Sequence, residues 1–145
     1  MSSAAEHDIQ IKDHWFKYSD FTIEDGYRKA NEILASGDLP TAIFCANDYI
    51  AAGAIRAILL AGLKVPDDIS IIGFDDVDVA RACFPRLTTL RQPLLEHGRL
   101  SASLLLDLIN GNEPANRNIT MEPELIERES VQSIPIQTGS TIPQQ

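Results

Sequence analysis

The pattern of apolar residues over positions 22–37 predicts an amphipathic helix. Apolar side chains recur there at helical spacing on one face, and charged side chains cover the other face. Thr22 precedes this pattern and Asp25 follows it by three residues, which is the spacing of an N-terminal capping box. Gly37 supplies a stop signal. We therefore expect a half-buried helix that begins at Thr22 and ends near Gly37.

The next stretch, residues 41–74, has the pattern of a βαβ unit. Thr41–Ala46 and Ile69–Phe74 are apolar without alternation, as expected of parallel strands covered on both faces. The intervening helix, Asp48–Gly62, carries only one charged side chain in its interior, that of Arg56, so it is apolar nearly all round. The sequence therefore predicts an α/β fold with an open parallel sheet flanked by helices, and a second face of this helix that needs a cover.

The remaining segments predict weaker elements. Pro93 marks the start of another helix, which has an apolar stripe and ends at Asn110 before Gly111. Residues 1–13 and 133–145 are polar and without periodicity, so we expect a disordered or extended N-terminal segment, one packed domain over 14–132 and a flexible tail. Short strands are predicted at His14–Ser19, Leu87–Leu90, Asn118–Met121 and Leu125–Ile126.

Charge and composition exclude several functions. Lys and Arg number 12 against 21 Asp and Glu, and this net charge of −9 opposes the phosphate attraction on which DNA binding depends. No apolar run is long enough to span a bilayer, and the N-terminus lacks the pattern of a secretory signal, so we expect a cytoplasmic protein with no membrane partner. Two cysteines without CxxC spacing and three scattered histidines predict neither a metal site nor a disulfide, and we expect no cofactor.

Candidate binding residues follow three of the predicted strands. These pairs are Asp20 with Phe21, Asn47 with Asp48, and Asp75 with Asp76. Ligands of open α/β sheets bind at the carboxyl ends of the strands, and carboxylates, amides and an aromatic ring would suit a sugar or a purine.

A structural role competes with binding for each of these residues. Side-chain oxygens at the start of a helix cap its free NH groups, and we favour this role for Asp48. For Asn47, Phe21 and Asp75 the pattern leaves binding and structure about even, because Asx residues populate turns and a lone aromatic ring is usually part of a core.

A longer motif resembles the LacI/GalR family of transcription regulators. The stretch PTAIFCANDYIAAGAIRAILLAGLKVPDDISIIGFDD is followed by FPRLTTLRQP and Gly98, and the similarity runs from about Tyr18 in SDFTIEDGY to about Ser130 in LIERESV. The resemblance implies a periplasmic-binding-protein-like domain of type I, with two α/β lobes around a ligand cleft. It places 14–89 in the carboxyl-terminal lobe and 91–118 in the crossover to the first lobe. Most of the first lobe and the DNA-binding helix-turn-helix would precede these residues, so the resemblance implies an incomplete domain.

The resemblance also assigns roles to single residues. Asn47, Asp75 and Phe21 match ligand-contacting positions, which favours binding for these three and structural roles for Asp48 and Asp76. A further ligand-binding arginine of the family would lie upstream, so we expect weak binding of a sugar, nucleoside or purine.

The apolar helix 48–62 and the segment 79–84 match the family's dimer interface. We therefore expect a homodimer rather than a helix enclosed within one chain, and exchange of the helix Pro93–Asn110 between chains is a further hypothesis. The interface residues implied are Ile55, Leu59, Val79, Cys83 and Phe84.

Three other functions are weighed against an effector-binding and dimerisation domain. An enzyme could use Asp75 and Asp76 to hold Mg²⁺ or to accept a phosphoryl group, but the sequence has neither a Gly-rich phosphate loop nor a GxSxG motif, so we expect no catalytic residues. A periplasmic sugar-binding protein would need an export signal. A stand-alone sugar-binding or pure dimerisation module remains the alternative.

Overall fold

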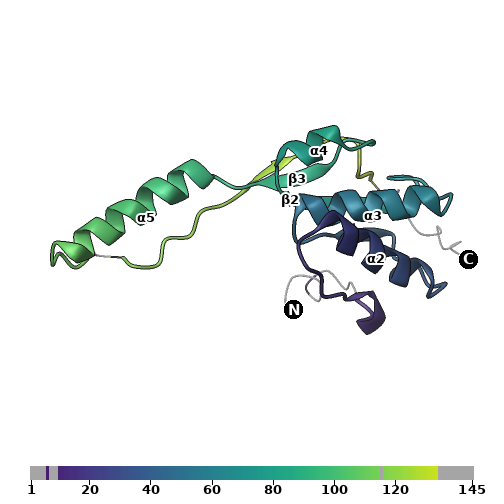
Figure 1. Cartoon of the computed structure of the whole chain (residues 1–145), viewed down its shortest axis with the longest axis horizontal. Coiled ribbons are helices and arrows are strands. Elements are labelled where there is room, and N and C mark those ends of the chain that lie inside the picture. The colour runs from purple at the N-terminus through teal and green to yellow at the C-terminus, as the bar shows by residue number, and fades with distance from the viewer. Residues whose placement is uncertain (1–5, 7–9, 115, 134–145) are drawn as a thin grey trace, which may run out of the picture.

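A four-stranded sheet with the strand order β1-β2-β3-β4 organises the fold. The computed structural model describes residue 6 and residues 10–114 and 116–133 (Figure 1). The first three strands are parallel, and the last pairs antiparallel with β3, so the sheet is parallel with one antiparallel edge strand. The strands are β1 (Ala42–Phe44), β2 (Ser70–Asp75), β3 (Thr88–Arg91) and β4 (Glu124–Ile126).

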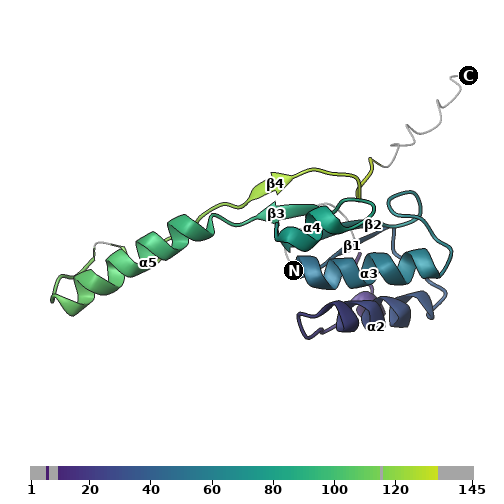
Figure 2. The ribbon, with the colours of Figure 1, turned by 45° about the horizontal axis from the view of Figure 1, so that its top comes forward.

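Helices lie beside this sheet and beyond it. Helix α3 follows β1 and packs on β2, and α2 lies alongside α3, as Figures 1 and 2 both show. The order β1-α3-β2 confirms the βαβ unit expected from the sequence. The helices are η1 (Asp13–Trp15, a 3₁₀ turn), α2 (Ile23–Leu34), α3 (Asp48–Leu60), α4 (Asp78–Ala82) and α5 (Leu94–Ile109).

Side chains cap the first two long helices. The Thr22 hydroxyl accepts a hydrogen bond from the Asp25 backbone NH at 3.1 Å, which confirms the cap predicted for α2. At α3 the expectation was wrong, because Asn47 rather than Asp48 is the N-cap and accepts from the Ile50 NH at 2.8 Å. Adjacent Asx residues can both cap, and here the second one is turned into the core.

Two glycines allow α2 and α3 to approach closely. A Cβ atom at Gly53 would lie 2.1 Å from the Ile23 carbonyl oxygen, and one at Gly26 would lie 2.3 Å from the Ile50 carbonyl oxygen. The buried core surrounds α3, which lies between α2 and the sheet. It includes Ala51, Ile55, Ile58, Ile69, Ile71 and Leu87.

The opposite face of the sheet is open, contrary to the expectation of two covered faces. Along β2 the burial alternates, with Ile71 and Gly73 buried but Ile72 and Phe74 only half-buried. Phe44 of β1 is 63% exposed. Among the described residues no helix packs on this face, since α3 lies on the other one, and the apolar strands therefore keep one side uncovered.

Two of the predicted strands do not form. Residues 13–15 make the 3₁₀ turn, and 16–19 continue outside the sheet; the Trp15 indole NH is bonded to the Asp38 carbonyl at 2.7 Å. Asn118–Met121 also lies outside the sheet. An apolar or alternating run becomes a strand only where a neighbouring strand satisfies its backbone groups, and neither segment has one here.

Helix α5 projects away from the rest of the chain (Figures 1 and 2). It confirms the helix predicted over 93–110, but none of its residues is buried. We call residues 92–114 and 116–123, which lie between β3 and β4, the α5 arm. Within the described ranges no helix is long and apolar enough to cross a bilayer. The predicted polar ends lie largely outside the described residues.

Candidate functional site

The sheet register brings two of the candidate binding residues to the same edge. Phe44 of β1 pairs with Ile72 of β2, and Asn47 and Asp75 each lie three residues further on. The Asn47 side-chain amide donates to the Phe21 carbonyl oxygen at 3.4 Å, so the segment that carries Phe21 reaches this edge too. Asn47, Asp75 and the backbone of the segment that carries Phe21 therefore lie at the carboxyl ends of the parallel strands.

Phe21 and Asn47 differ in how free their side chains are. Phe21 is 66% exposed, so its ring is available for stacking. Asn47 is buried, and its oxygen caps α3 while its amide nitrogen contacts Phe21. The capping role weighed for Asn47 is present in the structure, and one amide hydrogen remains for a ligand.

Asp75 occupies the end of β2 in a left-handed backbone conformation, with φ at 111°. Its Oδ1 accepts a hydrogen bond from Gln92 Nε2 at 2.5 Å. Sequence reasoning did not single out Gln92, although it follows a predicted strand just as the other candidates do. Applying the strand-end rule to Leu87–Leu90 would have found it.

Asp48 lies beneath this edge and is fully buried. Its carboxylate accepts from the Thr89 hydroxyl at 2.6 Å and from the Val77 backbone NH at 2.9 Å. Burial raises the pKa of Asp48 and outweighs these two bonds, which lower it. Gly73 makes room for the carboxylate, because a Cβ atom there would lie 2.3 Å from Asp48 Oδ1. Asp48 thus joins α3, β3 and the turn after β2.

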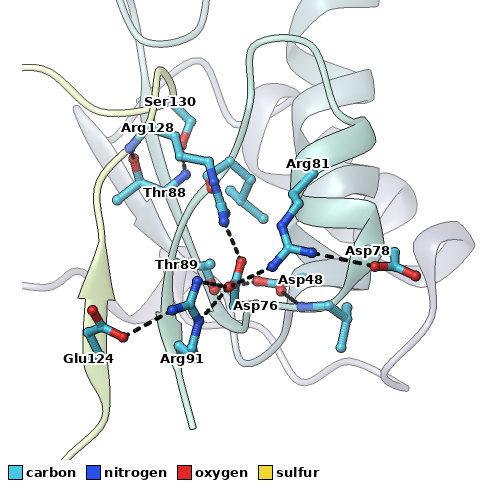
Figure 3. Close-up of polar contacts among 12 residues, drawn as sticks. Asp48, Asp76, Asp78, Arg81, Thr88, Thr89, Arg91, Glu124, Arg128 and Ser130 are labelled. Atoms are coloured by element: carbon cyan, nitrogen blue, oxygen red, sulfur yellow. Dashed lines mark hydrogen bonds and ion pairs between the residues drawn. The ribbon is translucent and has the colours of Figure 1, made fainter.

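Asp76 is the centre of an arginine cluster (Figure 3). Its side chain is 1% exposed and forms ion pairs with Arg91, Arg81 and Arg128. Burial alone would raise the pKa of Asp76, but the bonds from Arg128 and Arg91 hold it below its usual range. Asp76 therefore has no free oxygen facing the proposed ligand edge. We call these four residues the Asp76 cluster.

An apolar groove lies where a dimer interface was expected. Its lining residues are Ala52, Ile55, Arg56, Leu59, Leu60, Cys83 and Phe84. Phe84 is 85% exposed and Leu59 42%, whereas Ile55 is buried. Val79 is half-buried in α4, outside the groove lining. Burial raises the pKa of the Cys83 thiol, so this thiol is not activated.

Metal chemistry has no visible basis in the described part of the chain. No group of three or more His, Cys, Asp or Glu side chains is placed there to hold a metal ion. Asp75 and Asp76, which were weighed as Mg²⁺ ligands, instead bond to Gln92 and to arginines.

Comparison with known proteins gives relatives with a common role. Residues 2–131 match the model of the periplasmic binding protein-like domain family. The chain is 41% identical over 131 residues to the HTH-type transcriptional repressor PurR of Serratia proteamaculans, a match that covers 90% of this chain and 38% of the repressor. The chain thus spans about two fifths of the length of such relatives.

Solved structures similar to this chain are also transcription regulators. The transcriptional regulator CelR in complex with cellobiose superposes with a TM-score of 0.82 at 31% identity, over 88% of this chain and 39% of CelR. The lac repressor dimer bound to operator and the anti-inducer ONPF gives 0.79 at 30% identity, over 90% and 44%.

These relatives are transcription regulators and not enzymes. The family match, the strand order and the sequence identity all point the same way, and the chain belongs to the periplasmic binding protein-like domain family, with the sequence and fold of part of a LacI/GalR effector-binding domain.

Proposed function

We propose that this chain binds a small-molecule effector, a sugar, nucleoside or purine, through Phe21, Asn47 and Asp75, as part of a LacI-type transcription regulator in the cytoplasm. The observation that carries the proposal is the gathering of these residues at one sheet edge in a chain related to regulators. The CelR structure holds cellobiose, which is a ligand of the proposed class.

The groups at this edge suit a flat, hydroxylated ligand. The exposed Phe21 ring offers an apolar platform, and the Asp75 carboxylate accepts hydrogen bonds from hydroxyl or ring NH groups. A ligand donor would compete with Gln92 for Asp75 Oδ1. Because these groups line one side of an open edge, a bound ligand keeps much of its surface in water, and we expect weak binding.

Calorimetry with cellobiose and with hypoxanthine tests this proposal. We expect heat with one of the two probes and at least about a tenfold loss of affinity in Asp75→Asn, since a hydrogen bond to a charged group is lost. Asp67→Asn is the matched control, because Asp67 is an exposed carboxylate that precedes β2, at the opposite end of this strand from Asp75. No heat with either probe, or equal losses in both variants, would contradict effector binding at this site.

We propose that the apolar groove formed by α3 and residues 83–84 pairs two copies of the chain. The exposed rings and methyl groups of Phe84, Leu60 and Leu59 form an apolar patch of the kind that marks association surfaces. The structurally similar lac repressor was solved as a dimer. This groove also favours the alternative of a pure dimerisation module, which would associate without binding any ligand.

Sedimentation equilibrium of Leu59→Arg separates pairing through this groove from pairing elsewhere. A charge in an apolar interface is left without a partner, so we expect at least about a tenfold weaker association than in the parent chain. Leu95→Arg places the same charge on the exposed α5 and should leave the mass unchanged. A monomeric parent chain at micromolar concentration would contradict pairing. We propose that the 145 residues of this chain make no direct contact with DNA, because the net charge of −9 that they carry together repels phosphate.

A further inference from the structure

The α5 arm is attached to the sheet by two strands and little else. No residue of α5 is buried, and the arm leaves after β3 and returns before β4 (Figure 2). The direction of the arm therefore depends on what fixes the ends of β3 and β4. Beyond the ladder between the two strands, the largest concentration of polar contacts at this place is the Asp76 cluster.

The carboxylate of Asp76 bonds to residues at both strands from which the arm extends. Arg91, the last residue of β3, places Nε and Nη2 at 2.7 Å from Asp76 Oδ2. Arg128, just after β4, bonds to Asp76 Oδ1 and also donates to the Leu87 carbonyl at 2.7 Å. One buried carboxylate thus joins the outgoing and the returning strand, as the dashed lines of Figure 3 show.

The same carboxylate reaches the short helix α4. Arg81 of α4 lies with Nη2 at 3.3 Å from Asp76 Oδ2. Helix α4 leads directly into Cys83 and Phe84, which line the apolar groove. Asp76 therefore contacts both the strands from which the arm extends and the helix that precedes two of the groove residues.

The backbone around Asp76 is held in a conformation that side chains rarely adopt. Asp75 and Asp76 have φ angles of 111° and 56°, both in the left-handed region. The Asp48 carboxylate accepts a hydrogen bond from the Val77 backbone NH and so fixes the residue that follows Asp76. A non-glycine pair persists in such a conformation only where surrounding contacts enforce it, and the arginines provide those contacts.

From these contacts we infer that Asp76 is a positioning residue, whose carboxylate sets the direction of the α5 arm relative to the sheet and links that direction to α4. The turn that carries Asp76 also carries Asp75, whose partner Gln92 is the first residue of the arm. A change at the proposed ligand edge would thereby reach the arm and the groove through two adjacent residues. The positioning role itself does not require a ligand.

Spin-label distance measurements on the 145-residue chain test this role. One label at Glu24→Cys in α2 and one at Ser103→Cys in α5 report the direction of the arm, since both sites are exposed. Cys83→Ser removes the half-buried thiol, and Cys45 is 3% exposed and stays unlabelled. Dilution into unlabelled chain removes distances between copies.

We expect one narrow distance distribution in the parent chain and a distribution about twice as wide, or shifted, in Asp76→Asn. Ile58→Val is the matched control, because it shortens a fully buried side chain of α3 without touching the cluster or either label. A merely structural Asp76 would lower the melting temperature as Ile58→Val does and leave the distances unchanged. That result, or an equally broad distribution in the parent chain, overturns the inference.

Two further variants keep the test informative if Asp76→Asn fails to fold. The side chains of Arg91 and Arg81 are 45% and 57% exposed, so glutamine is tolerated at both positions. Arg91→Gln should broaden the distances between α2 and α5. Arg81→Gln should leave these distances narrow but speed amide exchange in α4, whose link to the carboxylate is lost. Unchanged distances in Arg91→Gln contradict the positioning role.

Discussion

Helices α3 and α5 are both rich in apolar residues, but only α3 is packed. Eight of the thirteen residues of α3 are buried, whereas α5 has sixteen residues and none of them is buried. Both helices carry recognisable start and stop signals, so local sequence accounts for each of them as a helix. The difference lies in their partners, because α3 is held between α2 and the sheet while the arm extends away from both.

This contrast shows which apolar surfaces of the described structure remain exposed to solvent. The exposed leucines and Ile109 of α5, the open face around Phe44 and the groove beside α3 are apolar surfaces that a longer chain or a second copy could bury. The chain spans about two fifths of its relatives. Packing in the described structure is therefore concentrated in the α2, α3 and sheet region.

Among the variants that test the difference between the packed α3 and the exposed α5, Gly53→Ala is expected to change the free energy of unfolding most. The new Cβ would meet backbone atoms of α2, and the helices must separate. We expect a loss of about 2–3 kcal/mol in the free energy of unfolding, since overpacking outweighs a gain of roughly 1 kcal/mol in helix propensity. Urea unfolding followed by circular dichroism measures this change in the free energy of unfolding.

Gly98→Ala in α5 is the matched control for this substitution. Nothing lies within 4 Å of a Cβ atom at Gly98, so the change should only improve helix propensity. If both alanines had the same effect on unfolding, the close approach of α2 and α3 would not be a source of stability.

A smaller effect on the free energy of unfolding is expected from a change of pH, and its sign is opposite for the two buried carboxylates Asp48 and Asp76. Burial raises the pKa of Asp48, so its contribution to stability is complete below the ordinary value of 3.8 and is lost as pH rises through the folded pKa. The arginine bonds lower the pKa of Asp76, so its contribution is present above 3.8 and is lost as pH falls through the folded pKa.

Urea unfolding of Asp48→Asn and Asp76→Asn between pH 3 and pH 7, at about half-unit steps, measures both trends. Relative to Asp48→Asn, the parent chain should become less stable as pH rises. Relative to Asp76→Asn, it should become less stable as pH falls. The stability difference between the parent chain and each variant is thus expected to change in opposite directions with pH. If both differences changed in the same direction, the environment assigned to one of the two carboxylates would be wrong.

Local patterns predicted the part of the fold that depends on neighbours in sequence. The Thr22 cap, the unit β1-α3-β2 and the helix after Pro93 all follow from signals within a few residues. The strand-end pattern also placed Asn47 and Asp75 at one edge of the sheet, which the register bears out. Their binding of a ligand stays a prediction.

Features that depend on distant residues were not predictable in this way. Arg128 and Asp76 are 52 residues apart, and a pair of charges at that separation leaves no periodic pattern. The choice of Asn47 over Asp48 as cap depends on whether Thr89 and Val77 offer donors to the second residue. The strand expected over 14–19 needed a neighbouring strand that the described chain does not provide.

The smallest effect is expected from Leu95→Ser, and it tests the α5 side of the comparison. Leu95 is 90% exposed, so in a chain where α5 is unpacked this change should alter the free energy of unfolding by less than about 0.5 kcal/mol. Ile58→Val, at a fully buried position of α3, should cost about 0.5–1.5 kcal/mol under the same conditions. A larger cost of Leu95→Ser that grows with protein concentration would mean that α5 packs against another copy, as in the exchange of the 93–110 helix between chains. A cost that is independent of concentration would instead mean that the arm folds back within its own chain, and the difference between α3 and α5 would then disappear in solution.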